Sequence, residues 1–132
     1  MSEPAAPGRA LRVLAIDDDE LVAQTVVAIL RSAGHEATSA PDGVEGLELV
    51  RNGSFNAVVT DIMMPRKEGI ETILEIRRDR PEIKIMAISG GSTGSTDFLQ
   101  WAQKLGADAV LAKPFSAQEF LDALHAMWPD ET

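Results

Sequence analysis

The sequence predicts an α/β protein built on one parallel sheet, and two observations carry this prediction. From residue 11 onward, short apolar runs alternate with longer stretches of helical period, and this pair of elements recurs five times. Three of the apolar runs, VLAI, AVVT and IMAI, are almost continuously hydrophobic, as expected of strands that helices cover on both faces. Because helices that join parallel strands cross over in a right-handed sense, the repeat implies a parallel sheet with helices on both faces.

The five strand and helix units follow one another in chain order. We expect strands at residues 12–16, 36–39, 57–60, 83–89 and 109–112, and helices at residues 20–33, 43–52, 69–79, 97–106 and 117–128. The second strand, EATS, is the most polar, so it is expected at an edge of the sheet. Five such units favour the flavodoxin-like, doubly wound strand order 2-1-3-4-5, in which ligands lie beyond the carboxyl ends of strands 1 and 3.

Helical spacing predicts which side chains of the first and last helices pack in the core. Apolar residues three and four positions apart share one face of a helix. The residues that we expect to be buried on this basis are Leu21, Val22, Val26, Ile29, Leu30, Phe120, Leu121 and Leu124. Asp19 comes just before the first helix and is well placed to act as its N-cap.

Length and composition limit the class of protein. The 132 residues fit one domain, and we expect a flexible arm at residues 1–10 and a folded domain at residues 11–130. The net charge of −9 disfavours direct binding to nucleic acid, whose backbone is also negative. No apolar stretch is long enough to span a membrane, so no membrane partner is expected. The absence of cysteine fits a cytoplasmic location.

Polar side chains with complementary chemistry follow four of the predicted strands. Asp17 and Asp18 follow the first strand, Asp61 the third, Ser89 ends the fourth and Lys113 follows the fifth. The carboxyl ends of parallel strands meet at one edge of a sheet, so these five groups should converge. Crowded carboxylates repel one another by roughly 1 to 4 kcal/mol per pair at about 4 Å, depending on the surrounding dielectric. A hard divalent cation such as Mg²⁺, which prefers carboxylate oxygens, would relieve this repulsion.

The same five groups indicate phosphoryl chemistry. A carboxylate beside a metal site can accept a phosphoryl group as an acyl phosphate, and Asp61 is placed to be that nucleophile. The ammonium of Lys113 and the hydroxyl of Ser89 can each contact a phosphoryl oxygen. The sequence therefore predicts a phosphoacceptor site at Asp61.

At these residues the chain resembles the CheY-like receiver domains of response regulators in two-component signalling. The resemblance rests on the motifs AIDDDE, VVTDIMMP, AISGG and VLAKPFS, which occur in this order, and it covers residues 11–128. It implies that Asp61 is phosphorylated by the phosphohistidine of a sensor histidine kinase or a histidine phosphotransfer protein. It also implies that Asp18 binds Mg²⁺ directly, that Asp17 supports the ion mainly through water, and that the carbonyl of Met63 completes the protein ligands.

The resemblance further implies a switch. Lys113 and Pro114 should be joined by a cis peptide bond, and Ser89 should move toward the phosphoryl group. The surface formed by the fourth helix, the fifth strand and the fifth helix should then change its affinity for a downstream effector protein. A phosphorylation-dependent homodimer is another partner that the resemblance allows. The domain would assist its own phosphorylation without acting as a turnover enzyme.

The sequence departs from the receiver pattern at positions that tune the switch. Val110 stands where the family often has an aromatic side chain, so the usual aromatic switch is not expected, and Trp101 is a candidate for transmitting the change instead. Met63 and Gly91 occupy two positions that influence dephosphorylation in the family, and neither can orient an attacking water. We therefore expect slow self-dephosphorylation.

Other interpretations of these residues stay open at the level of sequence. The three consecutive acids could serve only as helix caps, although one acid would suffice for that. A phosphohydrolase with an aspartyl nucleophile commonly carries a second acid two residues later, where this chain has Met63. A binding module that needs no phosphorylation is a third alternative. His35 and His125 have no partner at metal-ligand spacing in the sequence, and we assign them surface or packing roles.

Overall fold

A computed structural model describes residues 10–62, 68–89, 100 and 103–128 of the chain. The elements are β1 (Arg12–Ile16), α1 (Glu20–Ser32), β2 (Glu36–Ala40), α2 (Gly43–Asn52), β3 (Ala57–Asp61), α3 (Glu68–Asp79), β4 (Lys84–Ser89), β5 (Ala109–Ala112) and α5 (Ala117–His125). Residues 100 and 103–105 are also helical, within the range predicted for the fourth helix. The predicted strand and helix alternation is therefore confirmed.

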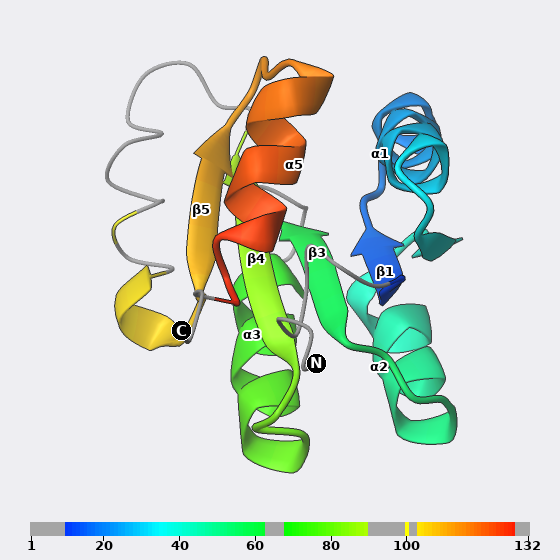
Figure 1. Cartoon of the computed structure of the whole chain (residues 1–132). Coiled ribbons are helices and arrows are strands. Elements are labelled where there is room, and N and C mark those ends of the chain that lie inside the picture. The colour runs from blue at the N-terminus through cyan, green and yellow to red at the C-terminus, as the bar shows by residue number, and fades with distance from the viewer. Residues whose placement is uncertain (1–9, 63–67, 90–99, 101–102, 129–132) are drawn as a thin grey trace, which may run out of the picture.

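The five strands form one parallel sheet in the order β2-β1-β3-β4-β5 (Figure 1). This is the predicted doubly wound order, and it places the polar strand β2 at an edge, as its composition indicated. The central strands β1, β3 and β4 are almost wholly buried, because helices cover both of their faces.

Two hydrophobic clusters fill the space between the sheet and its helices. One joins the sheet to α1 and α5, and its largest fully buried side chain is Phe120. The other lies on the opposite face, against α2 and α3, and is rich in isoleucine. Figure 1 shows α1 and α5 on one side of the sheet, with α3 behind it. Val26, Leu30, Phe120 and Leu124 are buried as predicted.

Leu21 is a correction, because its side chain is 76% exposed rather than buried. At about 100° per residue, Leu21 lies on the opposite side of α1 from Leu30, which is fully buried. The buried stripe of α1 runs through Ala23, Val26, Val27 and Leu30. The apolar character of Leu21 alone was therefore misleading.

The last helix ends earlier than predicted. α5 stops at His125, and residues 126–128 form turns in which the backbone N–H groups of Met127 and Trp128 donate to the carbonyls of Leu124 and His125. Met127 and Trp128 still pack against the cluster beneath α5. Their apolar character thus reflects core packing rather than further helix.

Two expectations concern the chain as a whole. Leu11 is 1% exposed, but residues 1–9 and 129–132 lie outside the described residues, so the bounds of the arm and of the folded domain stay predictions. Among the described helices, none is long and apolar enough to cross a membrane.

Candidate functional site

Three carboxylates converge at the carboxyl ends of β1 and β3. The two strands pair in parallel from Val13–Ala57 to Ile16–Thr60, so Asp17 and Asp61 extend from neighbouring strands at the same edge. One carboxylate oxygen from each of Asp17, Asp18 and Asp61 lies within 4.8 Å of the others. Asp17 and Asp61 are each only 6% exposed, while Asp18 is exposed. The predicted acidic cluster is therefore present.

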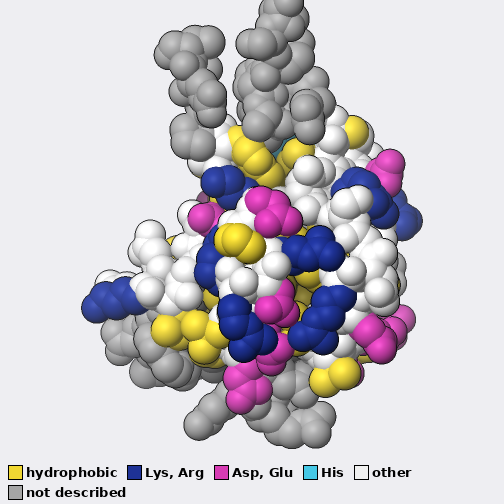
Figure 2. All heavy atoms as spheres, turned by 90° about the horizontal axis from the view of Figure 1, so that it is seen from below, with side chains coloured by type: hydrophobic (Ala, Val, Ile, Leu, Met, Phe, Trp, Pro, Cys, Tyr) yellow, Lys and Arg dark blue, Asp and Glu magenta, His cyan; other side chains and the backbone are white. Residues whose placement is uncertain are grey.

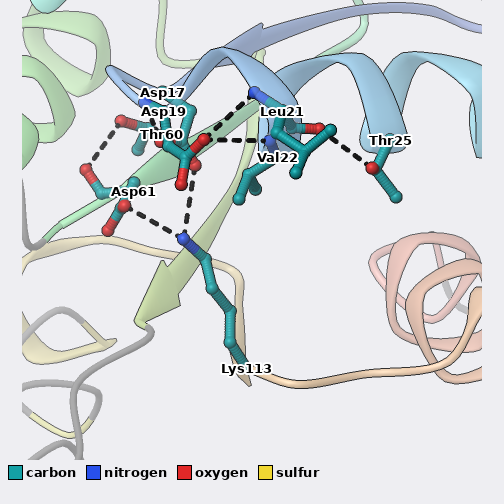
Figure 3. A network of polar contacts seen from close by, with 8 residues as sticks. All are labelled: Asp17, Asp19, Leu21, Val22, Thr25, Thr60, Asp61 and Lys113. Atoms are coloured by element: carbon teal, nitrogen blue, oxygen red, sulfur yellow. Dashed lines mark hydrogen bonds and ion pairs between the residues drawn. The ribbon is translucent and has the colours of Figure 1, made fainter.

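Lys113 reaches into this cluster from the end of β5 (Figure 3). Its Nζ lies 3.2 Å from Oδ2 of Asp61 and 3.4 Å from Oδ2 of Asp17. The backbone N–H of Lys113 donates to the carbonyl of Ser89, which fixes the end of β5 beside β4. The bond between Lys113 and Pro114 is cis, as the resemblance implied.

The pKa values of Asp17 and Lys113 are both raised, for different physical reasons. Burial raises the pKa of Asp17, and the charge of Asp61 adds to this, against the opposing effects of the Asp19 backbone N–H and of Lys113. Burial alone would lower the pKa of Lys113, but the charges of Asp61 and Asp17 outweigh it and raise that pKa overall. The lysine is therefore held as a cation, while an ionised Asp17 is costly to keep in this position.

The three consecutive acids have different tasks. Asp19 caps α1, since its Oδ1 accepts from the backbone N–H groups of Leu21 and Val22 at 3.0 and 3.4 Å. Asp17 accepts the backbone N–H of Asp19 at 2.8 Å, which fixes one of its carboxylate oxygens. Asp18 belongs to the carboxylate cluster without serving as a cap. Helix capping therefore accounts for one of the three acids, as predicted for Asp19, and not for all of them.

Ser89 is the last residue of β4 and is fully buried. Asp61 pairs with Ile88 in the sheet, so Ser89 lies one residue beyond the strand partner of Asp61. This register places Ser89 at the same edge as the carboxylate cluster. Its position agrees with the prediction that all five groups meet at the carboxyl ends of the strands.

Gly69 is a residue of the site that the sequence did not reveal. A Cβ at this position would overlap the carbonyl oxygen of Asp61 and lie 2.5 Å from Cα of Ile62. The first turn of α3 therefore packs directly on the backbone that carries Asp61. A glycine at the start of a helix is a weak signal by itself, and only the close approach gives it meaning.

A surface cavity of about 380 Å³ opens beside the acids. It is lined by Asp17, Asp18, Glu20, Ala23, Gln24, Ser39, Ala40 and Pro41. The cavity gives solvent and small ions a path to the cluster from the side of α1 and β2.

Two predicted site residues, Met63 and Trp101, lie outside the described residues. Val110 is partly buried and packs against the cluster that α2 and α3 cover.

Residues 13–125 match the family model of the response regulator receiver domain, so the chain belongs to that family of two-component signalling modules. It is 34% identical over 125 residues to the response regulator MprA of Mycobacterium sp. strain KMS, covering 92% of this chain and 54% of the relative. The chain thus spans about half the length of the curated relatives it matches.

Solved structures agree with this assignment. A response regulator receiver domain protein from Clostridium thermocellum superposes with a TM-score of 0.80 at 30% identity, covering 89% of this chain and 93% of that one. The response regulator TrrA of Thermotoga maritima, solved in complex with Mg²⁺ and BeF, superposes with a TM-score of 0.76 at 28% identity. That match covers 89% of this chain and 98% of the other.

The residues present fit a divalent metal ion. Asp17, Asp18 and Asp61 offer only carboxylate oxygens, which are the ligands that hard cations such as Mg²⁺ prefer. Burial and the charge of Asp61 raise the pKa of Asp17, so a cation bound beside it would favour its ionised form. The cluster is therefore able to bind a metal, and it is an acidic pocket of the kind found at phosphoacceptor sites.

Proposed function

We propose that this chain is a Mg²⁺-dependent phosphoacceptor switch in which Asp61 receives a phosphoryl group from the phosphohistidine of a sensor histidine kinase or a histidine phosphotransfer protein. The observation that carries the proposal is the joint contact of Lys113 Nζ with Asp61 and Asp17 inside a three-carboxylate cluster. A nucleophilic acid, further acids and a fixed cation are together what phosphoryl transfer to a carboxylate requires.

The transfer forms one bond and breaks one bond. A carboxylate oxygen of Asp61 bonds to phosphorus as the bond between phosphorus and the donor imidazole nitrogen breaks. The electron pair of the broken bond stays on that nitrogen, while the other ring nitrogen of the donor carries a proton. This leaves a neutral imidazole on the partner and an acyl phosphate on Asp61. A bound Mg²⁺ would supply charge neutralisation for the phosphoryl oxygens, held by Asp17, Asp18, Asp61 and the predicted carbonyl ligand of Met63.

Lys113 and Ser89 would stabilise the phosphorylated form. The ammonium of Lys113 already contacts Asp61, so it is placed to pair with a phosphoryl oxygen once Asp61 is modified. Ser89 ends the neighbouring strand, and we propose that its hydroxyl donates to another phosphoryl oxygen. Both contacts exist only after transfer, so they bias the domain toward its phosphorylated conformation.

We propose that the output surface includes the predicted fourth helix, whose described helical residues are 100 and 103–105, together with β5 and α5. Its partner would be a downstream effector protein or, on phosphorylation, a second copy of the chain. Val110 on β5 has no aromatic ring to rotate, so Trp101 is the candidate for transmitting the change. The predicted slow self-dephosphorylation and the cytoplasmic location belong to the same proposal.

Chemical labelling tests the function directly. Incubation with Mg²⁺ and acetyl phosphate, or with a phosphorylated kinase, should give an acid-stable, base-labile adduct of one phosphoryl group per chain. Asp61→Asn should abolish the label. Asp42→Asn is the matched control, because Asp42 caps α2 and lies outside the carboxylate cluster, and it should label normally. A label that persists in Asp61→Asn, or sustained release of phosphate, would overturn the switch.

A further inference from the structure

His35 and His125 contact each other at the end of the sheet opposite the acidic cluster. Their Nε2 atoms lie 3.1 Å apart, and the rings meet edge to face with centroids 5.3 Å apart. His35 is 7% exposed and His125 is partly buried. The two residues are 90 positions apart in the chain, so only the docking of α5 brings them together.

The protons of this pair are fixed by a third group. The backbone N–H of Leu11 donates to Nδ1 of His35 at 3.0 Å, and an amide N–H cannot accept. Neutral His35 must therefore carry its proton on Nε2, which points at His125. Nε2 of His125 must then accept, so its own proton sits on Nδ1. The arrangement is a chain of two hydrogen bonds, from Leu11 to His35 and from His35 to His125.

The same geometry excludes a metal ion between the rings. A ligating imidazole gives its lone pair on one nitrogen to the metal and normally keeps a proton on the other. His35 would need both nitrogens bare, one for the metal and one for the N–H of Leu11. The pair is therefore a proton-bearing contact and not a ligand site.

The contact ties together four elements. His35 lies between α1 and β2, and its backbone N–H donates to the carbonyl of Leu30. Through its ring it holds the residue before β1 and the last residue of α5. The end of α5 is thereby fastened to the amino-terminal edge of the sheet by a side-chain contact as well as by apolar packing.

An added proton has no place in this chain of hydrogen bonds. Each of the two donor–acceptor contacts, Leu11 to His35 and His35 to His125, already has one hydrogen atom between its two nitrogens. Protonation of either ring places a second hydrogen between two of these nitrogens. Two N–H donors then face each other, and that hydrogen bond is lost. Burial, together with the charge of His125, lowers the pKa of His35 accordingly. A lowered pKa means that this contribution to stability is complete above pH 6.5 and is lost as the pH falls below that value.

The charged groups around the pair already have partners. His35 shares a cavity of about 340 Å³ with Arg12, Arg31 and Glu36, which gives protons access from solvent. Arg12 pairs with Glu36, and Arg31 donates to the carbonyl of Ala37. On α5, Asp122 accepts from Gln118. Within the part of the chain that the structure describes, neither histidine forms an ion pair that would favour its protonated form.

We propose that His35 and His125 form a proton-operated latch, which fastens the end of α5 to the sheet when neutral and releases it when the pair is protonated. The latch does not depend on the proposed phosphoryl transfer, because it lies at the other end of the strands. It would, however, act on α5, which is part of the proposed output surface.

NMR spectroscopy of the untagged wild-type chain tests the latch without any substitution. The chain has only two histidines, so all imidazole signals belong to the pair. At pH 7.5 we expect the Nε2–H tautomer for His35 and the Nδ1–H tautomer for His125. His35 should titrate with a midpoint below 6.5. The opposite tautomers, or an ordinary midpoint for His35, would overturn the proposal.

Amide hydrogen exchange tests the release of α5. Between pH 7.5 and 5.5, after correction for intrinsic exchange, the protection of Ala126 and Met127 should fall by about tenfold, the effect of losing one hydrogen bond of ordinary net strength. His125→Ala should show the lower protection at both pH values. Asp122→Ala, one turn earlier on α5, is the control and should retain the pH dependence. Equal protection of the wild type at both pH values, or unchanged pH dependence in His125→Ala, contradicts the latch.

Discussion

At the amino ends of the strands, arginine side chains form ion pairs with acids, whereas at the carboxyl ends three carboxylates crowd around one lysine. Figure 2, which views the molecule from below, shows Lys and Arg side chains interspersed with Asp and Glu. The described pairs are Arg12–Glu36, Arg51–Glu75, Arg51–Asp79, Arg77–Asp108, Arg78–Glu75 and Arg78–Asp79. At the other end, Lys113 is shared between Asp17 and Asp61.

This difference separates groups that hold the fold together from groups that carry chemistry. Charges that are balanced within the protein have little to gain from an added ion. The acids at the carboxyl ends keep an uncompensated negative charge, so a cation bound there relieves repulsion that folding has left in place. The charges at the functional, carboxyl end of the sheet are thus less well balanced than those at the amino end. Four predictions test this difference between the two ends.

The largest effect is expected from Gly69→Ala. The new methyl group would collide with the backbone of Asp61 and Ile62, which cannot move aside as a flexible side chain would. We expect stability to fall by about 3 kcal/mol from overpacking. The labelling rate should fall about a hundredfold from misplacement of the nucleophile. Urea unfolding and acetyl phosphate labelling measure the two effects.

Gly53→Ala is the matched control for this substitution. Its Cβ would lie 3.1 Å from the carbonyl oxygen of Leu49, a milder contact at the opposite end of the molecule. Some stability should be lost, but the folded protein should label at the normal rate. Normal labelling of Gly69→Ala would show that the packing of α3 does not position Asp61.

Arg77→Met should give the next largest loss, confined to stability. The guanidinium donates to the carbonyls of Pro81, Ile83 and Gly106 and lies 2.6 Å from Oδ2 of Asp108. Asp108 in turn accepts the backbone N–H of Ile85. Removing this set of charge-assisted bonds should lower the free energy of unfolding by about 2 to 3 kcal/mol. Phosphorylation of the folded protein should be unchanged.

Arg78→Met provides the comparison for that variant. Its side chain is 70% exposed, and among the described residues its ion pairs are those with Glu75 and Asp79 at the surface. Exposed pairs of this kind contribute about 0 to 1 kcal/mol, so urea unfolding should barely change. Equal losses from the two arginine variants would show that the amino end is not held by the specific bonds of Arg77.

Asp17→Asn should have a smaller effect of opposite sign. Because the pKa of Asp17 is raised in the fold, its ionisation costs stability, and this cost grows as the pH rises above 3.8. The variant should therefore be more stable than the wild type by roughly 1 kcal/mol at neutral pH without metal, and the difference should shrink toward pH 3.8. Urea unfolding across this pH range measures both.

Mg²⁺ should reverse the order of stability of the wild type and Asp17→Asn. Millimolar Mg²⁺ should stabilise the wild type by binding only the folded state, and it should act weakly on Asp17→Asn. The test uses the same urea titrations with and without the ion. Equal responses of the two proteins to Mg²⁺ would remove Asp17 from the proposed metal site.

The smallest effects concern two aspartates that cap helices. Asp42 accepts the backbone N–H of Glu45 at 2.8 Å, and Asp42→Ala should cost about 1 kcal/mol. Asp19 caps α1 but also adds a negative charge next to Asp17 and Asp18. Asp19→Ala should cost about half as much, because lost capping is offset by relieved repulsion. A larger loss for Asp19→Ala than for Asp42→Ala would contradict the charge imbalance at this end.

Parts of the site were predictable because the carboxyl ends of parallel strands lie together at one edge of the sheet. Asp17, Asp61, Ser89 and Lys113 each follow or end an apolar run, and the carboxyl ends of such runs must meet at one edge. Side-chain direction was harder to predict, since Leu21 looked like a core residue and is exposed. The contact of Gly69 with the Asp61 backbone has no local signal, because it depends on where α3 docks.

The sequence by itself favoured the observed strand order, and it determined the alternation of strands and helices and the residues at the carboxyl edge. These follow from local periodicity and from the fixed handedness of parallel crossovers, which act over short stretches of chain. Only the tertiary structure decided that Lys113 bridges two acids and that His35 meets His125. Such contacts join residues far apart in the chain, and their distances depend on how whole helices and strands pack together.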